Sequence, residues 1–363
     1  MARPIRIFAL PIAVAISLAL GSRDGFAREF LHRGPPVGFQ VGGFGAAEFG
    51  YLRPHEILVK GQQTPPDTFV THVEGFLGVR WGTENISFQW AAWISKSDGD
   101  VGERNDFDFA QMTWRPTDWL RLDLGRFIFL PWEERAVLWE NYYTTSSVTE
   151  RAVYTGTPEG KNGLDLTLSL SDSVDLGAAI LTEGALSGIR NSPADGTVAN
   201  TFVTHLVVDG GGVLRLIGVG MFEAAKVSND QWNTERTPES WLYSLTAKFR
   251  FDGEDGSFFK ATVQARDTDA IFVDGQLIEP EEQVNTVAAA LHIRFTGDTL
   301  IFEGEFSEAA NIVEYDLQKD ISYVRIGYDI PVAAGANFLW EFENVFDGKS
   351  SSQELSFALK QTF

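Results

Sequence analysis

The segment ISFQWAAWIS, residues 86–95, decides the fold class, because apolar side chains alternate in it with mostly small or polar ones. Ile86, Phe88 and Trp90 fall on one face of an extended strand, and Ser87 and Gln89 fall on the other. The same alternation recurs in four later segments, at residues 164–170, 243–251, 287–295 and 337–346. A length of about ten residues is typical of strands that cross a bilayer at a tilt. These segments therefore predict membrane strands with one face toward lipid.

The connections between the alternating segments have two lengths. Tight turns are predicted at residues 171–173 and 296–298, and longer polar connections at 97–104 and 228–239. Short turns at one end and long loops at the other are typical of barrels inserted from the periplasm. The count is about 16 strands, which predicts an all-β, transmembrane, antiparallel up-and-down β-barrel. A soluble β-sandwich is the alternative, but its core would bury the charged side chains of these strands away from water, which is unfavourable.

The start of the chain has the features of a secretory signal peptide. Arg3 and Arg6 precede an apolar run at residues 7–20, and a small-residue cleavage site follows at residues 25–27. We therefore expect residues 1–27 to be removed and residues 28–363 to form a single barrel domain. Export of a barrel predicts an integral protein of a Gram-negative outer membrane, with membrane lipid around it.

The last strand ends on an aromatic residue. Leu355, Phe357, Leu359 and Phe363 share one face of the final ten residues. This segment resembles the β-signal of outer-membrane proteins, although Gln361 occupies a position that is usually apolar in that family. The resemblance implies recognition by the barrel-assembly machinery.

Composition excludes several classes of function. The net charge of -21 disfavours a nucleic-acid partner, and the absence of Cys excludes thiolate metal sites. The five His are scattered, and no phosphate loop or nucleophile elbow is present, so we expect no metal, no cofactor and no enzyme activity. The alternative, an enzyme activity, has one candidate pair of catalytic residues, His72 and Glu74, which lie on the same face of a predicted strand. Asp98, Asp100 and Asp106 lack EF-hand spacing, which leaves a solvated loop or a calcium site.

A long segment at residues 128–161 does not alternate. It contains Glu133, Glu134 and Glu140 together with several aromatic residues. Long loops inside compact folds are usually functional, and exposed aromatic residues would favour packing against a wall. We interpret the segment as a constriction loop folded into the barrel, with a solvated external loop as the alternative.

The sequence around this loop resembles that of the phosphate-selective porin O/P family. The resemblance rests on residues 125–127, 131–134, 143 and 150–152 and on Gly160 and Gly163. It implies a homotrimeric, 16-stranded porin. Members selective for phosphate carry dense Arg and Lys in the pore, and this loop has few basic residues, so phosphate selectivity is not predicted.

The register of the strands places charges on the inner face. The predicted inward basic residues are Lys248, Arg250, Lys260, Arg266, Arg294 and Arg325, and the predicted inward acidic residues of a later arc are Glu303, Glu305, Glu341 and Glu343. Such a wall either sets a field across the pore or holds the barrel together by pairing. The sequence predicts passive diffusion of ions and small hydrophilic solutes, with weak ion selectivity at most. The alternative is a surface adhesin or binding barrel with a plugged lumen.

Overall fold

The computed structural model describes residues 38–53, 68–97, 104–127, 161–182, 198–226, 239–251, 257–268, 271–273, 276–279, 282–310, 320–333, 336–346 and 351–362. Regular structure in these ranges consists of β-strands. Within them, no helix is long and apolar enough to cross a membrane.

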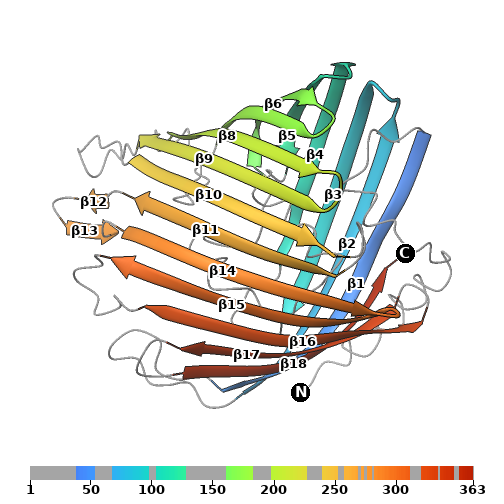
Figure 1. Ribbon diagram of the computed structural model, residues 1–363, viewed down its shortest axis with the longest axis vertical. Helices are drawn as coiled ribbons and strands as arrows, with labels where there is room; N and C mark the ends of the chain where they lie inside the picture. Colours follow the sequence, from blue (N-terminus) through green and yellow to red (C-terminus); the bar gives the residue numbers. More distant parts are fainter. Residues whose placement is uncertain are drawn as a thin grey trace, which may run out of the picture.

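Sixteen of the strands form one antiparallel sheet. In chain order they are β1 (Gly38–Arg53), β2 (Thr68–Gly82), β3 (Ile86–Ser97), β4 (Arg104–Thr117), β5 (Leu120–Phe127), β6 (Lys161–Ser171), β7 (Val174–Leu181), β8 (Val198–Gly210), β9 (Leu214–Lys226), β10 (Glu239–Arg250), β11 (Phe258–Thr268), β14 (Glu282–Phe295), β15 (Asp298–Ala310), β16 (Ile321–Ala333), β17 (Ala336–Phe346) and β18 (Ser351–Thr362). Each pairs with its neighbour in the chain, and β1 also pairs with β18, which closes the barrel (Figure 1). The predicted up-and-down barrel of about 16 strands is confirmed.

A short hairpin lies outside the barrel. Its strands, β12 (Ile271–Val273) and β13 (Gln276–Glu279), pair only with each other. In Figure 1 they project beyond the ends of β11 and β14. Strands of three and four residues are too short to show alternation, so the sequence did not predict them.

The tight turns gather at one end of the barrel, as predicted. Thr296 and Gly297 join β14 to β15 with φ angles of 38° and 114°. Two consecutive positive φ values define the two-residue hairpin turn that matches the twist of the flanking strands. The predicted turns at residues 171–173 and 296–298 are both confirmed. The connections at the opposite end are longer, including the one that carries β12 and β13.

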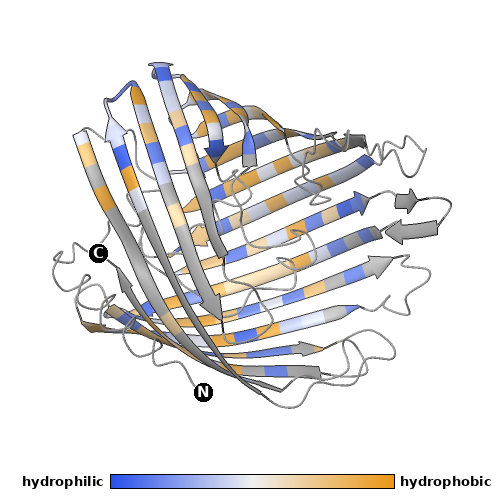
Figure 2. Ribbon diagram, turned by 180° about the vertical axis from the view of Figure 1, so that it is seen from behind, coloured by the Kyte–Doolittle hydropathy of each residue, from blue (hydrophilic) through white to orange (hydrophobic). Residues whose placement is uncertain are grey.

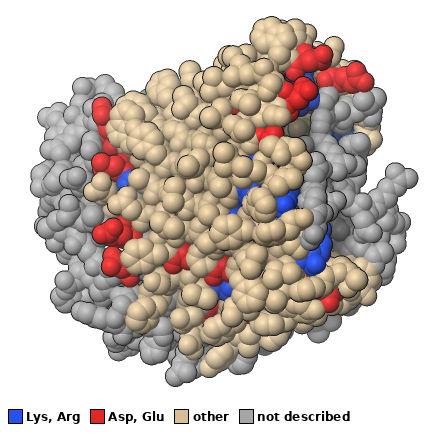
Figure 3. All heavy atoms as spheres, in the orientation of Figure 1, with Lys and Arg blue, Asp and Glu red and all other residues tan. Residues whose placement is uncertain are grey.

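The two faces of the sheet differ in chemistry. Leu245, Val263 and Val287 point outward and are about half exposed, whereas Gln264 and Thr286 point inward and are buried. Alternating bands of apolar and polar residues follow the strands in Figure 2. The face of the molecule in Figure 3 is mostly uncharged, and many of its acidic atoms lie along the edge where the long connections begin. This is the pattern of a barrel whose outer surface contacts lipid.

Aromatic side chains lie near the strand ends on the outer face. Trp81, Trp114, Trp119 and Trp241 are all 41–56% exposed. Trp81 stacks on Phe88 at 5.3 Å between ring centroids near the tight-turn end. Tryptophan rings prefer the boundary between hydrocarbon and water, so these residues mark the edges of the apolar band.

Candidate functional site

The inner wall aligns five of the ten predicted wall charges, Lys248, Lys260, Glu303, Arg325 and Glu343, in one register. Register pairing aligns seven inward positions on neighbouring strands from β9 to β17, which are Arg215, Lys248, Lys260, Ala290, Glu303, Arg325 and Glu343. Each lies directly opposite the next. We call Arg215, Lys248 and Lys260, on β9 to β11, the basic arc. We call Glu303, Arg325 and Glu343, on β15 to β17, together with Glu305 and Glu341 one inward position away, the acidic arc.

The basic arc contains neighbouring like charges. Lys248 lies directly opposite both Arg215 and Lys260, an arrangement that is unfavourable unless other groups offset it. The Lys248 ammonium lies over the ring of Phe258, 4.3 Å from the centroid, which partly stabilises the charge. Arg250, one inward position closer to the tight turns, donates from its guanidinium to the carbonyl of Gly212 at 3.3 Å.

The acidic arc is organised around Arg325. The Arg325 guanidinium donates to Glu303 Oε2 at 2.6 Å and lies 3.5 Å from Glu341 Oε1. His292 contacts the other oxygen of Glu303 at 3.2 Å and stacks on Phe258 at 4.3 Å. Arg325 is 3% exposed and Glu341 is fully buried, so the contacts replace lost hydration.

Arg325, predicted among the inward basic residues, belongs to the acidic arc, because β16 lies between the two strands that carry the glutamates. The remaining inward predictions fall as follows: Arg266 and Glu305 are buried on the inner face, and Arg294 is exposed near the tight turns. Their role as pore-lining residues stays a prediction.

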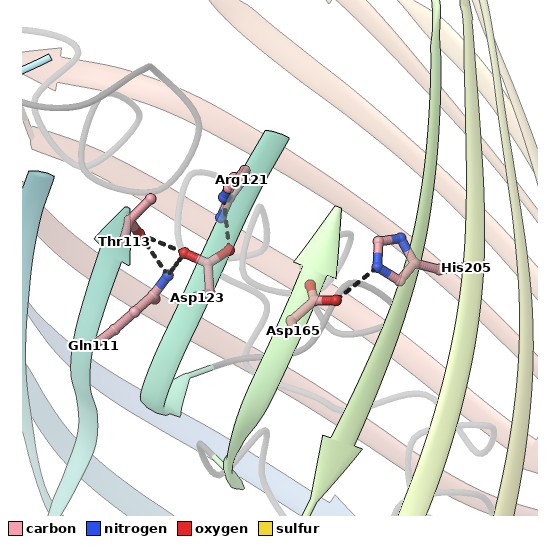
Figure 4. Close-up of polar contacts among 6 residues, drawn as sticks. All are labelled: Gln111, Thr113, Arg121, Asp123, Asp165 and His205. Atoms are coloured by element: carbon pink, nitrogen blue, oxygen red, sulfur yellow. Dashed lines mark hydrogen bonds and ion pairs between the residues drawn. The ribbon is translucent and has the colours of Figure 1, made fainter. Parts of the chain in front are cut away.

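A second polar cluster lies on β4 and β5 (Figure 4). Asp123 is 2% exposed and accepts hydrogen bonds from Thr113 and from the Gln111 amide, the latter at 2.6 Å. Arg121 lies 2.6 Å from the other carboxylate oxygen of Asp123. The buried carboxylate is therefore held by one cation and two neutral donors, which is enough to offset its burial.

Next to this cluster, an aspartate and a histidine pair across an intervening strand. Asp165 on β6 lies directly opposite Asp123, and its Oδ1 is 3.1 Å from Nε2 of His205 on β8 (Figure 4). His205 lies opposite Gly177 on β7, and a Cβ added at Gly177 would be 2.0 Å from the imidazole Nε2. The glycine is what lets the imidazole cross β7. Sequence reasoning missed this pair; its available signal was that Asp165, Gly177 and His205 all occupy inward positions.

Several predicted residues lie outside the described ranges. These are the constriction-loop residues Glu133, Glu134 and Glu140, the terminal Phe363, the signal peptide, and Asp98 and Asp100. The side chains of His72, Glu74 and Asp106 are likewise outside the description. Leu355, Phe357 and Leu359 lie on the outer face of β18. In the described part of the chain, no three His, Asp or Glu residues form a group that would hold a metal ion.

Sequence comparison finds no relative of this chain. No family model matches it, and no curated protein does. Solved structures do match in fold. The outer membrane channel DcaP of Acinetobacter baumannii superposes with a TM-score of 0.61 at 10% identity, over 90% of this chain and 97% of that one.

Two further structures are similar. The anion-selective porin from Comamonas acidovorans has a TM-score of 0.59 at 10% identity, covering 90% of this chain and all of the porin. The trimer form of OmpT, an outer membrane protein of Vibrio cholerae, has a TM-score of 0.54 at 11% identity with the same coverage. The chain, with its sixteen-stranded barrel, therefore has the fold of these outer-membrane porins and channels.

Proposed function

We propose that this protein is a passive channel in the outer membrane of a Gram-negative cell, which conducts ions and small hydrophilic solutes. The observation that carries the proposal is a closed barrel with an apolar outer face and charges of both signs on its inner face. Closure satisfies every backbone hydrogen bond without water, and polar interiors are typical of barrels that enclose an aqueous path.

The proposal includes the processing and partners that the sequence predicts. Residues 1–27 are removed as a signal peptide, the barrel-assembly machinery inserts the mature chain, and lipid surrounds it. The assembled form is a homotrimer, which the trimer form of the similar Vibrio cholerae protein supports. Residues 128–161 narrow the lumen as the constriction loop, with Glu133, Glu134 and Glu140 facing the basic arc.

Ion selectivity in this proposal is weak. The basic arc attracts anions, while the acidic arc carries four glutamates against one arginine, so neither sign of charge dominates the inner wall. Phosphate selectivity is not part of the proposal, because dense basic residues are absent from the sequence of the long loop.

Planar-bilayer recording of the purified, detergent-extracted protein tests the channel. We expect stable conductance steps in groups of three, with reversal potentials near zero in salt gradients. A folded preparation, verified by β-rich circular dichroism, that never conducts would overturn the proposal.

One observation favours a second candidate, a binding barrel with a filled lumen. Inward-facing polar side chains are strongly buried, among them Glu223 at 1% and Arg266 at 4% exposure. Water in a wide, open lumen would leave more of their surface accessible. Electrical silence together with a folded barrel is the result expected for this candidate.

We also propose that the barrel has no catalytic role. The Asp165–His205 pair makes a test worthwhile, because histidine and aspartate can activate water for hydrolysis. Solubilised protein should not hydrolyse ester or peptide reporters. Hydrolysis that disappears in Asp165→Asn would contradict the assignment.

A further inference from the structure

Part of the inner wall is apolar. On β7 to β10, eight inward side chains are apolar and at most 7% exposed, and we call them the inner apolar patch: Ala179, Leu181, Val203, Val207, Ile217, Val219, Met221 and Leu242. Register aligns four of them in one row across the four strands, which are Leu242, Met221, Val203 and Ala179. In the same row, the next two strands carry Asp165 and Asp123. The polar lining that is typical of a water-filled barrel is therefore interrupted on β7 to β10.

The inner apolar patch is covered on its lumen side. Leu181 and Leu242 are 0% exposed, and Val203 is 2% exposed. Side chains on one face of a sheet stand roughly perpendicular to it, so their neighbours in the sheet cover their flanks and leave their tips accessible. The described ranges form the wall itself and the hairpin outside it, so one of the segments between these ranges is left to supply the cover.

Two glycines lie between the patch and the point where the long segment leaves the wall. Gly125 on β5 lies directly opposite Gly163 on β6, and Gly163 lies opposite Leu181 of the patch. Gly125 has a φ of 117°, and a Cβ there would be 2.2 Å from the carbonyl oxygen of Ala110. A Cβ at Gly163 would be 2.4 Å from the carbonyl oxygen of Ile180. Neither position accommodates a side chain, so the inner lining has a gap beside the patch.

The ends of the long segment are close to the patch. Phe127 pairs with Lys161, so residues 128–160 leave the wall and return to it at adjacent points. Figure 1 shows β8, β9 and β10 beyond β5 and β6 around the wall, and β6 is two strand spacings, about 10 Å, from β8. A segment of this length spans that distance several times over.

The long segment also has the composition that an apolar surface requires. It contains six aromatic residues, which are Phe129, Trp132, Trp139, Tyr142, Tyr143 and Tyr154. Each of the other internal segments outside the described ranges contains at most one. Burying aromatic rings against aliphatic side chains removes apolar area of both from water, so this segment gains the most from the patch.

We propose that residues 128–160 pack aromatic side chains against the inner apolar patch, which anchors the constriction loop to β7 to β10. This inference rests on the constriction loop of the proposed channel and adds the surface on which that loop docks. Ile217, in the patch, is the next inward residue to Arg215 of the basic arc, about 7 Å away along β9. A loop anchored on the patch therefore holds its glutamates beside the basic arc.

Thiol labelling tests the docking, because the chain has no Cys of its own. Val203→Cys places one thiol in the patch. Ala288→Cys is the matched control, since Ala288 is a half-buried inward residue of β14, away from the patch. With the barrel in liposomes and a charged, water-soluble maleimide, we expect the control to be labelled and Val203→Cys to be protected until the protein is unfolded in urea.

Changes in the loop should remove this protection. Replacing residues 132–143 with a Gly-Ser linker of equal length should raise the labelling rate of Val203→Cys to that of Ala288→Cys, and leave the control unchanged. If the linker variant does not assemble, Trp132, Trp139 and Tyr143 changed together to Ser keep the loop length and remove only apolar area. β-rich circular dichroism verifies folding of each variant.

The outcomes separate the docking from the channel function. Labelling of Val203→Cys in the otherwise intact protein, or continued protection in the folded loop variants, would overturn the docking. Conductance of the same preparations is an independent measurement. A conducting barrel without loop-dependent protection makes the docking alone wrong, whereas loop-dependent protection in a barrel that never conducts supports the docking and makes the channel function wrong.

Discussion

His205 on β8 reaches Asp165 on β6 by passing over Gly177 of the intervening strand, with 3.1 Å between Nε2 and Oδ1. The pair thus joins two strands that share no backbone hydrogen bonds. It depends on a residue without a side chain at one position of β7, because a Cβ there would occupy the place of the imidazole.

Gly177→Ala should therefore destabilise the barrel. The new methyl group displaces His205 and leaves the buried Asp165 without its partner, for a combined loss of about 2–4 kcal/mol in the free energy of unfolding. Urea unfolding in lipid vesicles, followed by tryptophan fluorescence, measures it. Gly218→Ala is the matched control, because a Cβ at Gly218 meets nothing within 4 Å. Equal stability of the two variants would contradict a stabilising role for the Asp165–His205 contact.

Asp123→Asn removes the charge that Arg121 pairs with and leaves a weaker acceptor for Gln111 and Thr113. We expect a loss of about 1–2 kcal/mol, because hydrogen bonds to charged groups are stronger than neutral ones. The exposed turn residue Asp172, changed to Asn, should have no effect in the same unfolding assay. A neutral result at Asp123 would mean that its contacts contribute nothing to stability.

Arg325→Gln leaves Glu303 and Glu341 in the acidic arc without their shared cation. Breaking a buried ion pair from one side typically costs about 3–5 kcal/mol, so this variant should unfold at a lower urea concentration or fail to assemble. Arg294→Gln provides the control, since Arg294 is exposed to solvent. Equal stability of the two variants would contradict this prediction, because it would mean that other groups stabilise the buried charges of Glu303 and Glu341.

The basic residues near the tight turns should affect permeation. Replacing Arg250 and Arg294 together with Ala removes two positive charges from the inward positions of β10 and β14, so cation-over-anion permeability should rise. Reversal potentials in planar bilayers report the change. Unchanged potentials would show that neither residue contributes to the field in the pore.

The turn between β14 and β15 has a residue poorly suited to its conformation. Thr296 is β-branched at a φ of 38°, where Asn is preferred in two-residue hairpin turns. Thr296→Asn should stabilise the barrel by about 0.5–1 kcal/mol, whereas Gly297→Ala, at a φ of 114°, should destabilise it. The same urea assay measures the change in the free energy of unfolding for both variants. Stabilisation by Gly297→Ala would contradict the claim that this turn requires a positive φ at residue 297.

The fold was predictable because alternation is a local property. Residues 86–95 show both faces of their strand without knowledge of its neighbours, and the same holds for the segments that became β6, β10, β14 and β17. Tight turns such as Thr296-Gly297 were recognisable for the same reason. Inward and outward positions followed from parity, so the buried charges of the inner wall were on the predicted face.

The candidate site was less predictable because its contacts cross between strands. The place of Arg325 among glutamates depends on which strands flank β16 and in which register. The Asp165–His205 contact depends on three strands and on a missing side chain at Gly177. Neither follows from spacing along the chain, since the paired residues are separated by 40 positions in the second case.

The pairing of β1 with β18 also determines when folding can finish. The two strands come from opposite ends of the chain, and register joins Phe44 to Thr362 across more than 300 positions. Until β18 arrives, β1 and the last strand already in place each expose an unpaired edge, which is able to join another chain. A cell that makes this protein must therefore protect both edges of a partly built wall for the whole time that the rest of the sheet is assembled.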